Sequence, residues 1–167
     1  MSLTTRLSVA LAAQLTGTHD HAPPSSKLEP GWQIDLTNGT GAGKADRLWS
    51  DRRTIAASSS EDLDLAGSLT DALGATVTLA RVKLLAVYAL PTNTNDVVLG
   101  DAASATWTSL LGADGTIAVK PGGLLLAVAP GATAYPVTAT TADLLKVANS
   151  SSGSAVTYDI YIIGASA

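Results

Sequence analysis

The stretch that comes nearest to a chemical motif is a glycine-rich run ending in a lysine, Gly39-Thr-Gly-Ala-Gly-Lys44. Such runs cradle nucleotide phosphates when a further glycine begins the run, Ser or Thr follows the lysine, and a helix starts there. Asn38 and Ala45 occupy those two positions, and the residues that follow have no helical pattern. The sequence therefore predicts a flexible turn rather than a nucleotide site.

Metal-ligating side chains gather only at His19-Asp20-His21. Two histidines this close on an extended segment hold a metal only if other parts of the assembly supply further ligands. Two interpretations follow, a solvated linker or a metal held between subunits, and the sequence favours the linker because it offers no third ligand. We expect no resident metal and no other cofactor.

Nucleophilic catalysis needs a nucleophile, a base and a group that orients the base. The chain has no Cys, its two His lie in the same linker, and its Ser residues are scattered. The clustered carboxylates Glu61, Asp62 and Asp64 fall in a segment that reads as an exposed turn, where charges are usually only solvated. The sequence therefore predicts a protein that is not an enzyme.

The three tryptophans are the strongest candidates for binding. Trp107 either fills the core of a chain that lacks Phe or stacks on a sugar ring beside Asp101 and Asp114. Trp32 and Trp49 are flanked by linker and polar residues, and tryptophan with arginine is typical of protein interfaces. We therefore predict that a protein partner contacts four residues of this segment: Trp32, Trp49, Arg52 and Arg53.

The composition narrows the class of protein further. The chain has 167 residues, 46% of them hydrophobic and only 14% charged, which does not suit disorder. A net charge of −4 disfavours nucleic-acid binding, because neutralising phosphates requires clustered Lys and Arg. No apolar run approaches the roughly 20 residues of a membrane span. So apolar a chain must expose apolar surface, which usually marks contacts with other proteins.

Leucine recurs at every fourth position near the start, at Leu3, Leu7, Leu11 and Leu15. This spacing predicts a short amphipathic helix that needs a surface to lie on, and we assign its leucines to the partner contact. A signal peptide is the competing interpretation, but Gln14 interrupts the apolar stretch. The proline-containing segment from 18 to 30 reads as an extended linker, so residues 1–30 are expected to form an arm.

The remainder of the chain reads as β-structure. About eight short strands, spaced about 8 to 12 residues apart, predict an all-β sandwich or barrel. We expect a connecting segment at 31–60 and a β-domain at 61–167. The C-terminal segment, Asp143 to Gly164, reads as a long β-hairpin in which four residues share the buried face: Val156, Tyr158, Ile160 and Ile162. The run from Arg81 to Leu90 has the pattern of a central strand.

Four stretches carry a family resemblance: the one from Glu61 to Leu79, Val119-Lys-Pro-Gly-Gly-Leu124, Ala142-Asp-Leu-Leu-Lys-Val-Ala-Asn149 and Tyr158-Asp-Ile-Tyr-Ile-Ile-Gly164. Through these stretches, the part of the chain from 47 to 164 resembles a family of small structural proteins of tailed bacteriophage virions. The motifs are turns and strands without a chemical signature. The resemblance implies a jelly-roll-like domain that decorates or cements the capsid, commonly as a homotrimer, made in the host cytoplasm and placed on the virion surface.

Together these observations predict a non-enzymatic virion protein that binds the major capsid protein and itself, without nucleic acid or membrane. One alternative is a head-fibre, collar or tail component, which would share the fold. The other is a carbohydrate-binding module for attachment to the host. The resemblance leaves the position in the virion open.

Overall fold

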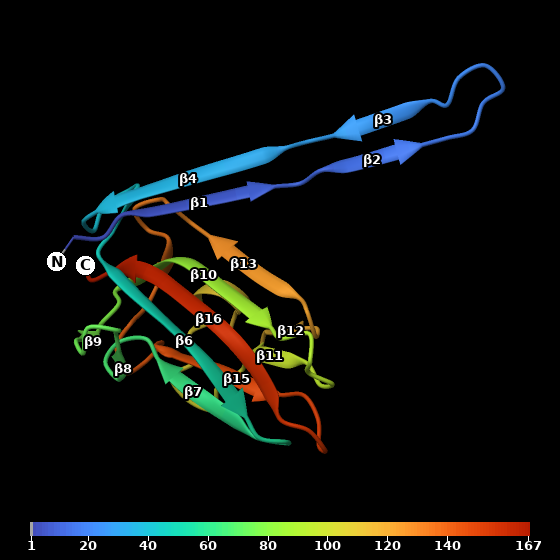
Figure 1. Ribbon diagram of the computed structural model, residues 1–167. Helices are drawn as coiled ribbons and strands as arrows, with labels where there is room; N and C mark the ends of the chain where they lie inside the picture. Colours follow the sequence, from blue (N-terminus) through green and yellow to red (C-terminus); the bar gives the residue numbers. More distant parts are fainter. Residues whose placement is uncertain (1) are drawn as a thin grey trace.

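The computed structural model describes residues 2–167, and in them the chain is mostly β, with several antiparallel sheets. Two sheets form a body, and a long two-stranded hairpin projects from one end of it (Figure 1). The described residues contain one helix, the single turn α1 (Thr108–Leu111). We refer to residues 44–167 as the body and to the hairpin of residues 3–38 as the arm.

The first sheet of the body has the strand order β13-β10-β16-β6, with β14 also paired to β10. Its two central strands, β10 and β16, are antiparallel from Arg81↔Ala165 to Ala89↔Tyr158. The pairing shifts by one residue between Val82 and Leu84, which leaves Lys83 in a bulge. The strands of this sheet are β6 (Arg47–Ile55), β10 (Arg81–Ala89), β13 (Leu124–Val128), β14 (Tyr135–Pro136) and β16 (Val156–Ala165).

The second sheet has the strand order β12-β11-β15-β7, and all its pairs are antiparallel. Its strands are β7 (Ser60–Asp64), β11 (Val97–Gly100), β12 (Thr116–Val119) and β15 (Leu144–Asn149). A short hairpin of β8 (Leu69–Thr70) and β9 (Thr76–Val77) follows β7 in the sequence. Both strand orders are open paths, so within residues 2–167 no sheet closes into a barrel.

The two sheets pack against each other through one apolar core, to which both contribute. The side chains predicted to share the buried face of β16 are confirmed: Val156, Tyr158, Ile160 and Ile162 are all buried. The central position predicted for residues 81–90 is also confirmed, since β10 lies between β13 and β16. Period-two alternation along each strand thus places one face of each sheet in the core.

The prediction of a C-terminal hairpin is wrong. β15 pairs with β7 and β11 in the second sheet, whereas β16 lies between β10 and β6 in the first. The loop from 150 to 155 crosses from one sheet to the other instead of turning within a sheet. Both strands carry inward apolar side chains, such as Val147 and Tyr158, and facing each other across the core buries them more completely than lying side by side.

The prediction of an N-terminal helix is also wrong. The segment forms β1 (Thr5–Ala10) and β2 (Ala13–Thr16), which pair antiparallel with β4 (Gly31–Asn38) and β3 (Ser25–Leu28). A spacing of four fits a helix, but it is also an even number, so the same leucines share one face of a strand. Long-range pairing decides between the two, because a strand partner at 25–38 satisfies the backbone. Within the expected linker at 18–30, four residues form the paired strand β3 and residues 18–24 make the turn at the tip of the hairpin.

Substituting Gly164 with Ala should destabilise the body by about 1–3 kcal/mol, the usual cost of overpacking. A Cβ there would overlap the carbonyl oxygen of Arg81 and lie 2.7 Å from Cδ2 of Leu79. Gly131→Ala is the matched control, because its Cβ would meet no atom within 4 Å. Urea denaturation compares the stability of the two variants. Equal midpoint concentrations of urea would show that β16 tolerates a side chain at position 164.

Candidate protein-binding surface

The arm is one continuous ribbon. The register Ala10↔Gly31 in the first part and Ala13↔Leu28 in the second follow the same pairing without a slip. Between them the Leu11 backbone N–H donates to the Pro30 carbonyl at 3.0 Å. A further bond of the same register, from the Gly17 N–H to the Pro24 carbonyl at 2.9 Å, extends the ribbon to its tip. The register therefore continues without a slip from the base to the tip, across the interruption of the strands at 11–12 and 29–30.

This register sorts the arm residues into two faces, because alternate side chains of a strand point to opposite sides. One face is mostly apolar, with Thr5 and Ser26 as its two hydroxyl residues, and the other carries the charged groups and the remaining polar side chains. The apolar face consists of Leu3, Thr5, Leu7, Val9, Leu11, Ala13, Leu15, Pro24, Ser26, Leu28, Pro30, Trp32, Ile34 and Leu36. The polar face consists of Arg6, Ser8, Gln14, Thr16, Ser25, Lys27, Glu29, Gln33 and Asp35, with Ala10, Ala12 and Gly31 between them.

At its base the apolar face packs on the body. Leu36 is buried in a second apolar cluster with Ala45, Leu84 and Ile163, and Leu3, Leu7 and Ile34 pack against the same cluster. Leu84 and Ile163 are outward-facing residues of the first sheet and lie opposite each other in the ladder. The base of the arm therefore covers one end of the outer face of that sheet, and this contact fixes where the ribbon leaves the body.

Towards the tip the same apolar face has no partner within the chain. Every residue of β2 and β3 is exposed, and in Figure 1 these strands stand clear of the body. The exposed fractions are 49% for Leu11, 75% for Leu15, 58% for Leu28 and 57% for Trp32. An apolar stripe of this length on an isolated ribbon is typical of a surface that binds another molecule. We call these four residues the tip face.

A second exposed apolar surface lies on the body, on the part of the first sheet that the arm does not cover. The ladder places Leu126, Ala86 and Tyr161 in one row across the strands, and Leu124 and Tyr88 in the next. Leu48 lies opposite Ile163 on the edge strand β6. Leu48, Leu124 and Tyr161 are among the most exposed large apolar side chains of the body. Ala86 and Leu126 are half-buried and pack against the cluster that holds the arm base, and Leu48 lies in the same row as Leu84 and Ile163 of that cluster. We call the other three residues, Tyr88, Leu124 and Tyr161, the outer patch.

The glycine-rich run forms the turn between β4 and β5 (Lys44–Ala45), as predicted, and it helps to fix the arm. The buried Lys83 ammonium donates to the carbonyl oxygens of Gly41, at 3.3 Å, and Gly131. Burial lowers the pKa of Lys83, and the charge of Arg81 lowers it further. The run thus offers a carbonyl oxygen, that of Gly41, to a cation, the opposite polarity from a phosphate cradle. The role of Lys83 was missed in the sequence, where its only signal is a lone charge within an apolar strand.

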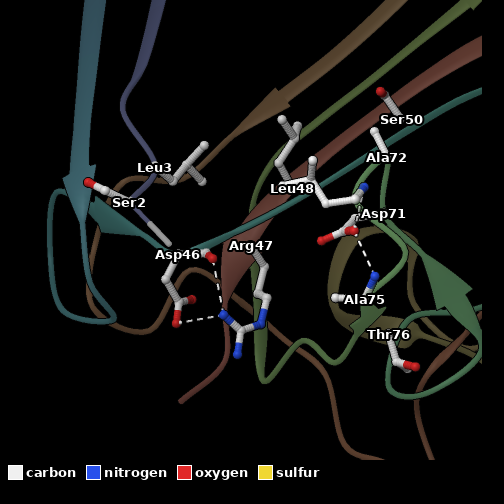
Figure 2. A pocket seen from close by; sticks show the side chains of 11 residues that line it. Ser2, Leu3, Asp46, Arg47, Leu48, Ser50, Asp71, Ala72, Ala75 and Thr76 are labelled. Atoms are coloured by element: carbon white, nitrogen blue, oxygen red, sulfur yellow. Dashed lines mark hydrogen bonds and ion pairs between the residues drawn. The ribbon is translucent and has the colours of Figure 1, made fainter.

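A pocket of about 470 Å³ lies at the root of the arm, between the start of β1, the beginning of β6 and the turn at 71–76 (Figure 2). Its apolar lining includes Leu3, Leu48 and Leu73. Its charged groups are already engaged. The carboxylate of Asp46 accepts from Ser166 and Arg47, and that of Asp71 accepts from the backbone N–H groups of Leu73 and Ala75. The pocket therefore suits an apolar side chain better than a reacting substrate.

Two tryptophans lie inside the body. Trp49, predicted to contact a partner, lies opposite Ile162 and faces inward, so it packs in the core and is not on the surface a partner would meet. Trp107 is also buried; its indole N–H donates to the Pro136 carbonyl at 2.7 Å, and its ring packs edge-on against Tyr135. Of its two interpretations, core packing is the one confirmed, and Trp107 offers no stacking platform beside Asp101 and Asp114. Trp32 alone is exposed, as an interface residue would be.

The two predicted arginines are engaged in ion pairs within the chain. Arg52 binds Asp159 of the neighbouring strand with two bonds, at 2.6 and 2.8 Å, and this pairing lowers the pKa of Asp159. Arg53 points toward the second sheet, where its Nε donates to Glu61 at 2.6 Å. The Tyr158 hydroxyl donates to the same carboxylate at 3.0 Å, and burial raises the pKa of Tyr158. Glu61 therefore ties the two sheets together at their open edge.

The histidine cluster lies in the turn at the tip of the arm, where the His21 backbone N–H donates to Nδ1 of His19 at 3.3 Å. Among residues 2–167 no group of three or more His, Cys, Asp or Glu side chains is arranged to hold a metal ion. In the same residues no helix has the length and apolar character needed to cross a membrane.

Comparison with known proteins identifies no relative: no family model, no curated protein and no solved structure matches the chain. The evidence on function therefore lies in the exposed surfaces of the chain, the tip face and the outer patch.

Replacing Glu61 with Ala should lower the free energy of unfolding by about 1–3 kcal/mol, because it leaves the buried Tyr158 hydroxyl and the Arg53 guanidinium without their shared acceptor. Arg6→Ala removes an exposed ion pair, to Asp35 at 2.7 Å, and should cost no more than about 1 kcal/mol. Urea denaturation at neutral pH measures both. Equal effects would contradict the role of Glu61 as a tie between the sheets.

Along the arm, the same kind of substitution should have opposite results at the two ends. Leu36→Ala should cost about 2–5 kcal/mol, because Leu36 is buried where the arm meets the body. Leu15→Ser with Leu28→Ser should change stability by less than about 0.5 kcal/mol per site, because both side chains are exposed. Thermal or urea denaturation of dilute protein tests this; a large loss in the double variant would mean that the tip face packs within the chain.

Proposed function

We propose that the chain is a non-enzymatic structural protein of a tailed-bacteriophage virion that decorates or cements the capsid. In this proposal the body is a jelly-roll-like sandwich that sits on the capsid lattice among copies of itself, and the arm clasps a neighbouring subunit. The observation that carries the proposal is the arm: a ribbon anchored at its base, with an apolar tip face that projects from the body.

Three further features support this function. The resemblance of residues 47–164 to phage structural proteins rests on strands and turns, which the two-sheet body contains. The charged side chains that line the pocket at the arm root, Asp46, Arg47 and Asp71, are all engaged within the chain, which favours a binding role over acid–base catalysis there. A subunit repeated on a symmetric lattice gains avidity from many weak contacts, so a narrow arm suffices where an isolated complex would need a larger interface.

The test is co-sedimentation with virions assembled without this protein. We expect saturable binding of the full chain at a fixed multiple of the major capsid protein. A variant with a shortened arm, in which Asn-Gly joins Leu11 directly to Pro30, keeps the β1–β4 pairs that pack on the body. It should fold but bind particles at least tenfold more weakly, because it loses the contact that supplies the avidity.

Each other result revises the proposal in a definite way. Binding at a dozen or fewer sites per particle would assign the chain to a vertex, collar or tail. Full occupancy by the shortened variant would remove the arm from the contact. Absence of binding by the full chain would overturn the virion assignment and return attention to attachment of glycans.

A further inference from the structure

We propose that the subunit clasped by the arm is a second copy of this chain, and that the tip face of one copy packs on the outer patch of the next. The inference rests on the proposed function only in that the chain acts as several copies side by side. It specifies which surfaces meet, and it is tested without any other virion protein.

The chain already makes a contact of this kind at the arm base. There the apolar face of the ribbon packs on outward-facing side chains of the first sheet, through Leu36 on Leu84 and Ile163. The tip face continues the same side of the ribbon in an unbroken register. The outer patch continues the same side of the same sheet. The proposed contact therefore extends an interface that the chain already forms. The exposed part of the arm's apolar face would pack on the exposed part of the outer face of the first sheet in a neighbouring copy.

Neither surface is covered within its own chain. The register runs unbroken from base to tip, so bringing Leu15 or Leu28 down to the body of the same chain would require the hairpin to fold back on itself. Every residue of β2 and β3 is exposed, and in Figure 1 both strands stand clear of the body. The tip face and the outer patch are therefore both free to pack on a neighbouring copy, which carries the same two surfaces.

The distribution of charge on the two surfaces also favours this contact. The apolar face beyond Val9 carries no charged side chain, because Lys27 and Glu29 lie on the opposite face. Beside the outer patch the charges are Arg52 and Asp159, and these already neutralise each other through two hydrogen bonds. Packing the two surfaces together therefore buries no unpaired charge. Burial of an unpaired charge would strongly oppose association.

A contact between two different patches of the same molecule is heterologous, so every copy both clasps and is clasped. Such contacts close into a ring when the rotation between copies permits, and otherwise grow into an open chain. The contact thus predicts an assembly in which each copy donates one tip face and receives another, either in a closed set of copies or in an open chain.

The experiment uses the absence of Cys from the chain. Leu28→Cys and Leu124→Cys are prepared as separate variants, mixed, and treated with a short bis-maleimide, so that a product joining the two mutated sites must link different chains. We expect this cross-link in high yield. The matched control replaces Leu28→Cys by Lys27→Cys, which lies on the polar face of the same strand and should give at least fivefold less product.

Light scattering of the chain without substitutions provides the second readout. We expect a mass above that of one chain, falling to the monomer in the Leu15→Ser, Leu28→Ser variant. A monomer at all concentrations would overturn the inference, because the tip face would then bind something other than this chain. Cross-links joining only Leu28→Cys to itself would also overturn it, because they would show that arms pair with arms.

These outcomes are separable from those for the proposed function. Lattice binding to particles without the Leu28–Leu124 cross-link would leave the virion assignment standing and refute this contact. The cross-link without particle binding would establish the self-association and refute the virion assignment.

Discussion

The pairing of β10 with β16 is the interaction on which the rest of the structure depends. These two strands carry apolar side chains on both faces: Val87 and Ile160 point into the core between the sheets, whereas Leu84 and Ile163 point outward. A sheet that is apolar on both sides must be covered on both sides. The second sheet covers the inner face. The base of the arm covers one end of the outer face, so the arm is an integral part of the packing at its root and a free ribbon only beyond it.

Sequence patterns predicted the body better than they predicted its connections. Period-two alternation identified the buried face of β16 and the central position of β10 because both follow from neighbours along the chain. The assignment of β15 and β16 to opposite sheets depends instead on which distant strand each one meets. That choice cannot be read from Leu145, Val147 or Tyr158 alone, since the same inward side chains fit a hairpin equally well until the rest of the core is known.

The arm shows the same limit from the other direction. Leu3, Leu7, Leu11 and Leu15 share a face in a helix and in a strand, so their spacing identified an apolar stripe but assigned it to the wrong element. The segment at 25–36 decided the matter because its alternation matches that of the first strand. Trp32 is exposed and Trp49 is buried, a difference that composition alone does not reveal, because polar neighbours on an edge strand do not show that every second residue faces the core.

The unbroken register of the ribbon has a consequence for how such a protein can change over evolution. Inserting one residue into each strand of the arm would turn every side chain beyond the insertion to the opposite face, and the apolar stripe would switch sides midway. Inserting two residues into each strand would leave both faces intact and lengthen the arm by about 6.8 Å. The reach of the arm can therefore vary only in steps, and natural variants should differ in this segment by even numbers of residues per strand.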